Sequence, residues 1–226
     1  MPDAERNPAM SGRIRQRPLR PRGLAAMLLV LLLPGYALAA GPFGTQEVAF
    51  RGTLAYPRFG EMTARYASQF DEAAACPAAG GRGICGVARE WAGLITSVSG
   101  LGRRAQVAAI NRWFNRLDYV DDLANWGVGD YWETPFEFLD LGRGDCEAFA
   151  IAKYYTLRAL GFDVTTLRIV IVDDRRRNMQ HAVLAVFLDG EVLILDNLAD
   201  EPVPDLALRH YQPLMSINEL GVWVPV

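Results

Sequence analysis

One cysteine in the second half of the chain stands where a nucleophile could be activated. Cys146 opens a stretch that predicts a helix as far as Leu160, ended by Gly161. Asp145 can accept a hydrogen bond from a backbone N–H of the first turn, which leaves Cys146 as the first helical residue. The positive end of the helix dipole lowers the pKa of a thiol at that position, and a thiolate is a competent nucleophile. The neighbouring carboxylates oppose this effect, so a histidine partner would matter. The alternative is a buried structural cysteine.

Two histidines, His181 and His210, could serve as the base for this nucleophile. His210 lies in a polar segment near proline, whereas His181 begins a β-rich run over residues 181–188. A second β-rich run covers residues 191–197, and the Asp189-Gly190 pair between the two runs predicts a hairpin with a two-residue turn.

The register of this hairpin brings a carboxylate to His181. With a two-residue turn, His181 pairs with Leu198, and Asp196 becomes its diagonal neighbour on the same sheet face, at roughly 7–8 Å between backbones. A slip of one residue would place Asp196 on the opposite face. Asp196 can hold one ring nitrogen of His181 while the other faces Cys146, so the sequence predicts a Cys–His–Asp catalytic triad.

The elements that would position these residues follow a helix-then-strand order. Residues 41–59 are mixed in character and predict an extended segment. The predicted elements that follow are helices over 61–75, 87–98 and 104–117, an ordered acidic and aromatic connection over 119–144, the helix of Cys146, and a strand over 164–172. This order predicts the α+β class, with a helical lobe over about 57–160 and a sheet lobe over about 161–226.

The beginning of the chain has the three-part layout of a secretory signal peptide. Five arginines lie within residues 13–22, an apolar run covers 24–33, and small residues follow at Ala37-Leu38-Ala39. We expect a signal peptide over 1–39, a single domain over 40–226 and a periplasmic location. An uncleaved anchor is the alternative, although the apolar run is too short to span a bilayer as a helix. A start at Met10 would leave a leader of ordinary length.

The charge and the cysteines of the mature chain restrict its functions further. Without the leader, 17 basic and 24 acidic residues give a net charge of −7, which disfavours nucleic acid as a partner. No second apolar segment is long enough to cross a membrane. Of the three cysteines, Cys76 and Cys85 could form a disulfide in an oxidising compartment or could stay reduced. Cys146 is then left over.

Several segments resemble the bacterial transglutaminase-like cysteine proteinases, and the resemblance covers roughly residues 85–226. The most specific segment is the nucleophile helix, in which Gly144-Asp145-Cys146-Glu147 precedes Ala150-Ile151-Ala152-Lys153-Tyr154-Tyr155. The supporting segments are Val120-Asp121-Asp122, Asp130-Tyr131-Trp132-Glu133-Thr134-Pro135, Leu167-Arg168-Ile169-Val170, His181-Ala182-Val183-Leu184-Ala185, Leu195-Asp196-Asn197-Leu198, Ser216-Ile217-Asn218 and Gly221-Val222-Trp223. One departure is Ala148, where the family often has Asp after the Cys-Glu pair.

The resemblance implies a papain/transglutaminase-like fold with the triad on Cys146, His181 and Asp196. It also implies a calcium requirement, with Asp145 and Glu147 as ligands, because two nearby carboxylates suit a hard cation. The alternative is that both acids only complement the helix dipole. Further calcium ligands could come from Asp121, Asp122 and Asp130.

The resemblance implies a substrate and a regulator as well. The substrate would be the periplasmic N-terminal region of a large surface adhesin, cut near an Ala-Ala pair, which releases the adhesin and disperses biofilm. The regulator would be an inner-membrane cyclic-di-GMP receptor that sequesters the protease. Trp126 and Trp132 are candidates for that contact, with packing inside the domain as the alternative. The sequence leaves open a transglutaminase-like amide transferase and a non-catalytic calcium-dependent binding module.

Overall fold

The computed structural model describes residues 38–52, 56–77 and 83–226, which belong to one compact unit from Ala37 to Val226. Helices precede most of the strands, so the α+β prediction is confirmed. The helices are α1 (Pro57–Ala74), α2 (Ile84–Val98), α3 (Arg103–Phe114), α4 (Asp122–Trp126), α5 (Pro135–Leu141) and α6 (Cys146–Ala159). Residues 1–37 of the predicted signal peptide lie outside the described residues, and the predicted cleavage point after Ala39 falls within the first strand.

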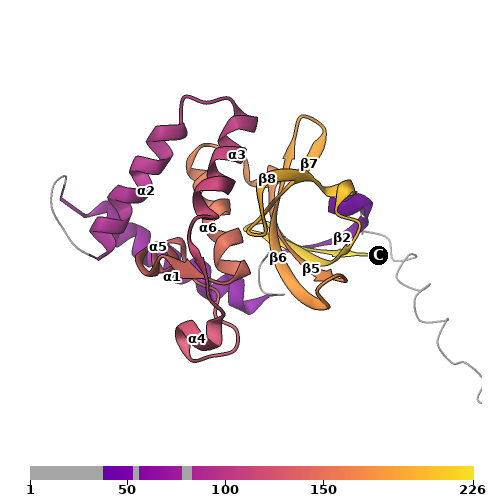
Figure 1. The fold of residues 1–226 in the computed structure, drawn as a ribbon, viewed down its shortest axis with the longest axis horizontal. Helices are drawn as coiled ribbons and strands as arrows, with labels where there is room; N and C mark the ends of the chain where they lie inside the picture. Colours follow the sequence, from indigo (N-terminus) through magenta and orange to yellow (C-terminus); the bar gives the residue numbers. More distant parts are fainter. Residues whose placement is uncertain (1–37, 53–55, 78–82) are drawn as a thin grey trace, which may run out of the picture. The chain divides into compact units, whose positions relative to one another are not determined.

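Eight strands of the described chain form one curled antiparallel sheet in the order β1-β2-β10-β9-β5-β6-β7-β8 (Figure 1). The strands are β1 (Leu38–Ala40), β2 (Gln46–Arg51), β5 (Leu167–Asp174), β6 (Met179–Leu188), β7 (Glu191–Asp196), β8 (Ala199–Pro204), β9 (Tyr211–Asn218) and β10 (Gly221–Pro225). The segment predicted to be extended supplies β1 and β2, and β2 pairs with β10 from the far end of the chain. Local sequence carries no signal for that partner.

Both faces of the central strands are buried. In β6, Ala182 and Leu184 join the core shared with the helices, whereas Val183 and Ala185 join a smaller cluster with Val170 on the inner face of the curl. Successive side chains of a strand point to opposite faces, so a strand covered on both sides reads as a continuous apolar run.

Helix α6 is buried along almost its whole length, from Cys146 to Leu157, and packs against β6, α3 and α5. Its end agrees with the sequence, because Gly161 adopts φ +80° directly after the cap. A helix surrounded in this way has little freedom to slide or rotate, so its first residue is fixed relative to β6.

The Asp189-Gly190 turn sets the predicted hairpin register. Both residues have positive φ, 53° and 79°, as a type I′ turn requires, and Leu188 pairs with Glu191. The pairing continues to Leu184 opposite Leu195, which confirms the register on which the position of Asp196 depends.

The acidic connection is more structured than its sequence suggested. It holds α4, α5 and a short parallel pair, β3 (Asp118–Tyr119) with β4 (Arg143–Gly144). Helix α5 starts with a capping box, in which the Thr134 side chain accepts from the Glu137 N–H and the Glu137 carboxylate accepts from the Thr134 N–H. The pattern Thr-Pro-x-Glu carries this signal in the sequence.

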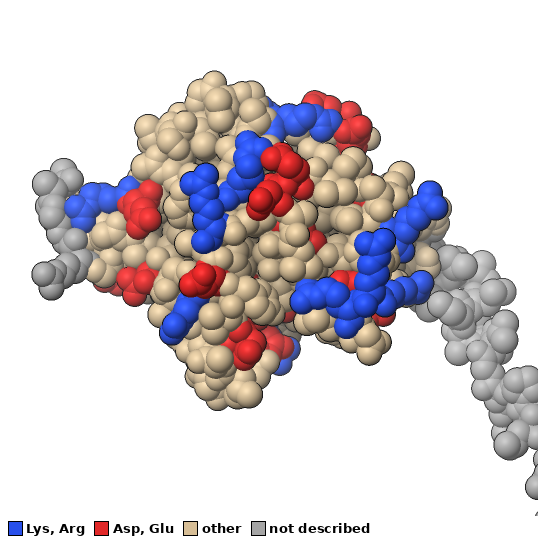
Figure 2. All heavy atoms as spheres, viewed as in Figure 1, with Lys and Arg blue, Asp and Glu red and all other residues tan. Residues whose placement is uncertain are grey.

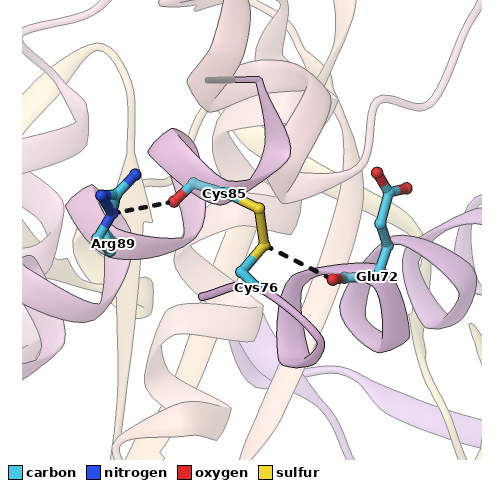
Figure 3. Close-up of a disulfide and its surroundings, with 4 residues drawn as sticks. All are labelled: Glu72, Cys76, Cys85 and Arg89. Atoms are coloured by element: carbon cyan, nitrogen blue, oxygen red, sulfur yellow. Dashed lines mark hydrogen bonds between the residues drawn. A yellow bond between two sulfur atoms is a disulfide. The ribbon is translucent and has the colours of Figure 1, made fainter. Parts of the chain in front are cut away.

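A disulfide and surface ion pairs join elements that are separate in sequence. Cys76, just after α1, is bonded to Cys85 in the first turn of α2, and Figure 3 shows this bridge beside the carbonyl of Glu72. The open question about these two cysteines is thereby answered in favour of the bridge. Arg112 of α3 pairs with Glu201 of β8, and Figure 2 shows basic and acidic side chains next to one another on one face.

Candidate active site

The nucleophile candidate is held at the start of α6 by its neighbours on both sides. The Asp145 side chain accepts from the Ala148 N–H at 3.1 Å, and Cys146 is the first helical residue, as predicted. On the other side, Gly144 pairs with Tyr119 in the short parallel ladder. A Cβ at Gly144 would lie 2.5 Å from Glu133 Oε2, so only glycine fits there. Cys146 stays a free thiol and is 6% exposed.

His181 and Asp196 are in direct contact, as the register predicted. His181 Nε2 lies 2.9 Å from Asp196 Oδ1, which also accepts from the Leu198 N–H at 3.0 Å. Asp196 Oδ2 accepts from the Tyr211 hydroxyl at 2.6 Å. Burial acts to raise the pKa of Asp196, but the hydrogen bonds from His181, Tyr211 and Leu198 outweigh it and hold the pKa below its usual value. The carboxylate is therefore ionised with its oxygens occupied.

The Cys146 sulfur meets strand β6 next to His181. The backbone N–H of Ala182 lies close enough to the sulfur to act toward a lower pKa of the thiol, and Ala182 directly follows His181 in the strand. The Cys146 thiol also donates to Glu147 Oε2 at 2.9 Å. Burial and the carboxylates of Glu147 and Asp145 raise the pKa of the thiol. The carboxylates thus oppose the effect of the helix dipole, as the sequence predicts, and together with burial they outweigh it.

Acidic side chains gather beside the nucleophile. Burial, then the charges of Glu147 and Asp122, raise the pKa of Asp145 to about 9. Burial raises the pKa of Asp122 too, and Glu147 contributes. Oδ1 of Asp122 is buried and has no hydrogen-bond partner among the described residues. Asp130 carries a smaller part of this repulsion and forms an ion pair with Arg58 at 2.7 Å.

These carboxylates suit a calcium ion by the chemistry of their donors. Asp122, Asp145 and Glu147 offer hard oxygen ligands, their charges repel one another, and one buried oxygen has no partner. Within residues 38–52, 56–77 and 83–226, however, no three His, Cys, Asp or Glu side chains form a ready-made metal site. Asp121, the remaining candidate ligand, caps α4 by accepting from the Ala124 N–H at 2.9 Å.

The other sequence candidates lie outside this cluster. His210 packs its ring against Tyr211, and its Nδ1 has no hydrogen-bond partner among the described residues. Trp132 is 3% exposed and packs against Tyr56. It therefore lies inside the domain, which is the alternative to a contact with the regulator. Trp126 is half-buried, stacks on Tyr131 and donates its indole N–H to Glu133.

Comparison with known proteins identifies the family. The family described as bacterial transglutaminase-like cysteine proteinase matches residues 94–225, which is more than half of the chain. The chain belongs to this family. None of the curated proteins compared with the chain matches it.

Solved structures of another bacterial protein, LapG, resemble the chain. Legionella pneumophila LapG has 34% identity and a TM-score of 0.57, covering 65% of this chain and 81% of LapG. A calcium-bound form of LapG has 32% identity and a TM-score of 0.58, covering 70% and 87%. An EGTA-treated form has 33% identity and a TM-score of 0.58, covering 66% and 80%. The fold is therefore transglutaminase-like, as predicted, and the protein is a cysteine protease by family.

Sequence reasoning missed some residues of this cysteine protease that contact the candidate triad. Tyr211 holds Asp196 but stands in a segment with no motif, and only its pairing in β9 brings it there. Asn115 donates to the main-chain carbonyl of Asp196 at 2.9 Å from the end of α3.

No helix in the described part of the chain is long and apolar enough to span a membrane.

Proposed function

We propose that this protein is a cysteine endopeptidase with Cys146, His181 and Asp196 as its catalytic triad. The observation that supports it most is the 2.9 Å contact between His181 and Asp196, directly beside the residue whose N–H meets the Cys146 sulfur. Because Asp196 occupies Nε2 of His181, Nδ1 is the nitrogen left to exchange protons with the thiol.

In the proposed reaction His181 takes the thiol proton, and the Cys146 sulfur attacks the peptide carbonyl. The C–N bond then breaks, the leaving amine takes the proton from His181, and an acyl-thioester remains on Cys146. Water donates a proton to His181 and adds to the thioester carbonyl. The C–S bond breaks, and the proton returns to the sulfur as the acid leaves.

The N-terminus of α6 supplies a donor for the oxyanion formed in both steps. The N–H groups of Ala148 and Phe149 are bonded to the side chain and the carbonyl of Asp145. The N–H of Cys146 precedes them and needs no partner inside the helix. We assign this N–H to the oxyanion, where a fixed dipole is most effective.

Calcium belongs to this proposal, with Asp122, Asp145 and Glu147 as the residues that would hold it. Support comes from the mutual repulsion of these carboxylates, from the unpartnered oxygen of Asp122, and from LapG structures that are calcium-bound and EGTA-treated. A bound cation would offset the two negative charges that raise the pKa of Cys146. The thiol would then ionise more readily.

The substrate, location and regulator in the proposal follow the family resemblance. We propose that the protease acts in the periplasm on the N-terminal region of a large surface adhesin, and that cutting releases the adhesin and disperses biofilm. We further propose that an inner-membrane cyclic-di-GMP receptor sequesters it. Trp126, the half-buried tryptophan of α4, is the aromatic side chain that this contact could use.

The test is cleavage of a purified adhesin N-terminal fragment from the same bacterium, with calcium and with EGTA. We expect cutting with calcium that is lost with EGTA and in the variants Cys146→Ala and His181→Ala. His210→Ala is the matched control and should keep cutting, because within the described residues the His210 ring packs on Tyr211 and has no hydrogen bond to Cys146, His181 or Asp196. Cutting that survives EGTA would refute the calcium requirement and leave the proposed triad in place. If the protein transfers an acyl group to an added amine and does not cut the fragment, an amide transferase is favoured. If the wild type neither cuts nor transfers, and Cys146→Ala binds the fragment as well as the wild type does, a binding module is favoured.

A further inference from the structure

Lys153 is an unusual residue in this chain. It is the single lysine among 23 basic residues, the others being arginine, and it is fully buried. Burying an ammonium group is costly unless it is hydrogen-bonded, and a guanidinium is larger and planar. A compact group with three donors is therefore what this position requires.

Two asparagines of α3 receive this ammonium group. Nζ of Lys153 donates to Asn111 Oδ1 at 2.8 Å and to Asn115 Oδ1 at 2.7 Å. The two asparagines are four residues apart, so they lie on one face of α3. An ammonium group can only donate, and this fixes each amide with its oxygen toward Lys153 and its nitrogen away from it.

The amide nitrogens then hold the chain at the end of β7. Asn115 Nδ2 donates to the carbonyl of Asp196 at 2.9 Å and to that of Ala199 at 3.0 Å. Asn111 Nδ2 donates to the carbonyls of Ala199 at 2.6 Å and Asp200 at 2.8 Å. One of these bonds ends on the main chain of Asp196, and the other three end on Ala199 and Asp200, the first two residues of β8.

The main chain of Asp196 needs such support because it pairs on one side only, with Ala199 of β8. The pairing of β6 with β7 stops at Leu195, and the pairing of β7 with β8 shifts register between Ile194 and Asp196. The side chain of Asp196 is held on the sheet side by His181. Its main chain is held on the helix side by Asn115.

We propose that Lys153 is a positioning residue that, through Asn115 and Asn111, fixes Asp196 and thereby the orientation of His181 toward Cys146. This rests on the proposed triad. Lys153 lies seven residues after Cys146, two turns along the same helix, so α6 carries the nucleophile and also anchors the residue that orients its base.

The electrostatics of the site agree with this assignment. Burial lowers the pKa of Lys153 to about 7, and the charges of Asp196 and Asp200 act against that shift. The ammonium is therefore close enough to Asp196 to interact with its charge as well as with its main chain.

The test measures the reactivity of Cys146 without any peptide substrate. In the full chain with calcium, alkylation of Cys146 by iodoacetamide is followed by mass spectrometry as a function of pH, alongside urea unfolding. We expect Lys153→Met and Asn115→Ala each to slow alkylation at neutral pH by about tenfold and to move the pH profile, because a small displacement of a catalytic group has a large effect on rate. The double variant should be no slower than the slower single variant.

Two controls separate the possible outcomes. Arg158→Met removes a positive charge from the same helix and should leave alkylation unchanged, because Arg158 contacts Phe162 and Glu219 instead of Asp196. His181→Ala should slow alkylation if the proposed triad is correct. If alkylation is slow in His181→Ala but unchanged in Lys153→Met and Asn115→Ala, the positioning role is overturned and the triad is kept. Unchanged alkylation in His181→Ala would overturn both. If Lys153→Met does not fold, Asn115→Ala decides, since it leaves Lys153 bonded to Asn111.

Discussion

Replacing Tyr211 by Phe tests the charged hydrogen-bond network around Asp196. The substitution removes only the hydroxyl that donates to Asp196 Oδ2 at 2.6 Å and keeps the ring contacts with His181 and Phe43. A buried hydrogen bond to a charged group contributes about 1.5–3 kcal/mol, and here the carboxylate oxygen is left without that donor. We expect the free energy of unfolding at neutral pH to fall by about 2 kcal/mol.

The sign of the pH dependence follows from the lowered pKa of Asp196. A carboxyl group with a folded pKa below its ordinary value stabilises the fold above that value, and the contribution is lost as the pH falls through the folded pKa. Removing the Tyr211 donor moves the folded pKa upward. The difference in the free energy of unfolding between wild type and variant should therefore be largest at neutral pH and become smaller in the acid range.

The assay is urea unfolding followed by tryptophan fluorescence, at neutral pH and at a series of acid pH values. With an m-value of about 2 kcal/mol/M, the midpoint should drop by about 1 M at neutral pH. Tyr119→Phe is the matched control and should stay within about 0.5 kcal/mol of wild type, because Tyr119 is half exposed and its hydroxyl has no hydrogen bond in the described structure. A Tyr211→Phe variant as stable as this control, or a difference that does not depend on pH, would refute the network.

Four further predictions concern the disulfide, strand β4 before the nucleophile and, twice, the acidic cluster. Replacing both bridged cysteines by serine should lower the free energy of unfolding by roughly 2–3 kcal/mol, the loop-closure value for a separation of 9 residues, and equal urea midpoints for the two proteins would contradict this. Gly144→Ala should lower the free energy of unfolding by about 2 kcal/mol or more in the same assay, because its Cβ would meet Glu133 at 2.5 Å, and a neutral effect would show that this segment can relax. Without calcium, the raised pKa of Asp145, from 3.8 to about 9, predicts that stability falls as the pH rises between these values. Calcium should raise the melting temperature, and Asp122→Asn should reduce that shift in thermal scans with calcium and EGTA, whereas equal shifts would exclude Asp122 as a ligand.

The sequence alone predicted the parts of the site that depend on short-range chemistry. Asp145 caps α6 through a backbone N–H three residues away, and the Asp189-Gly190 turn sets the pairing of β6 with β7. A cap and a two-residue turn are decided by neighbouring residues, so the contact of His181 with Asp196 followed from counting residues.

Contacts between distant segments were decided only by the tertiary structure. Tyr211 reaches Asp196 through the strand order, and Lys153 acts on Asp196 through Asn115 at the end of α3, and a local pattern encodes neither contact. The surroundings of Cys146 show the same limit. The sequence predicts that the neighbouring carboxylates oppose the helix dipole, but burial, which raises the pKa of the thiol most, exists only once the chain has packed.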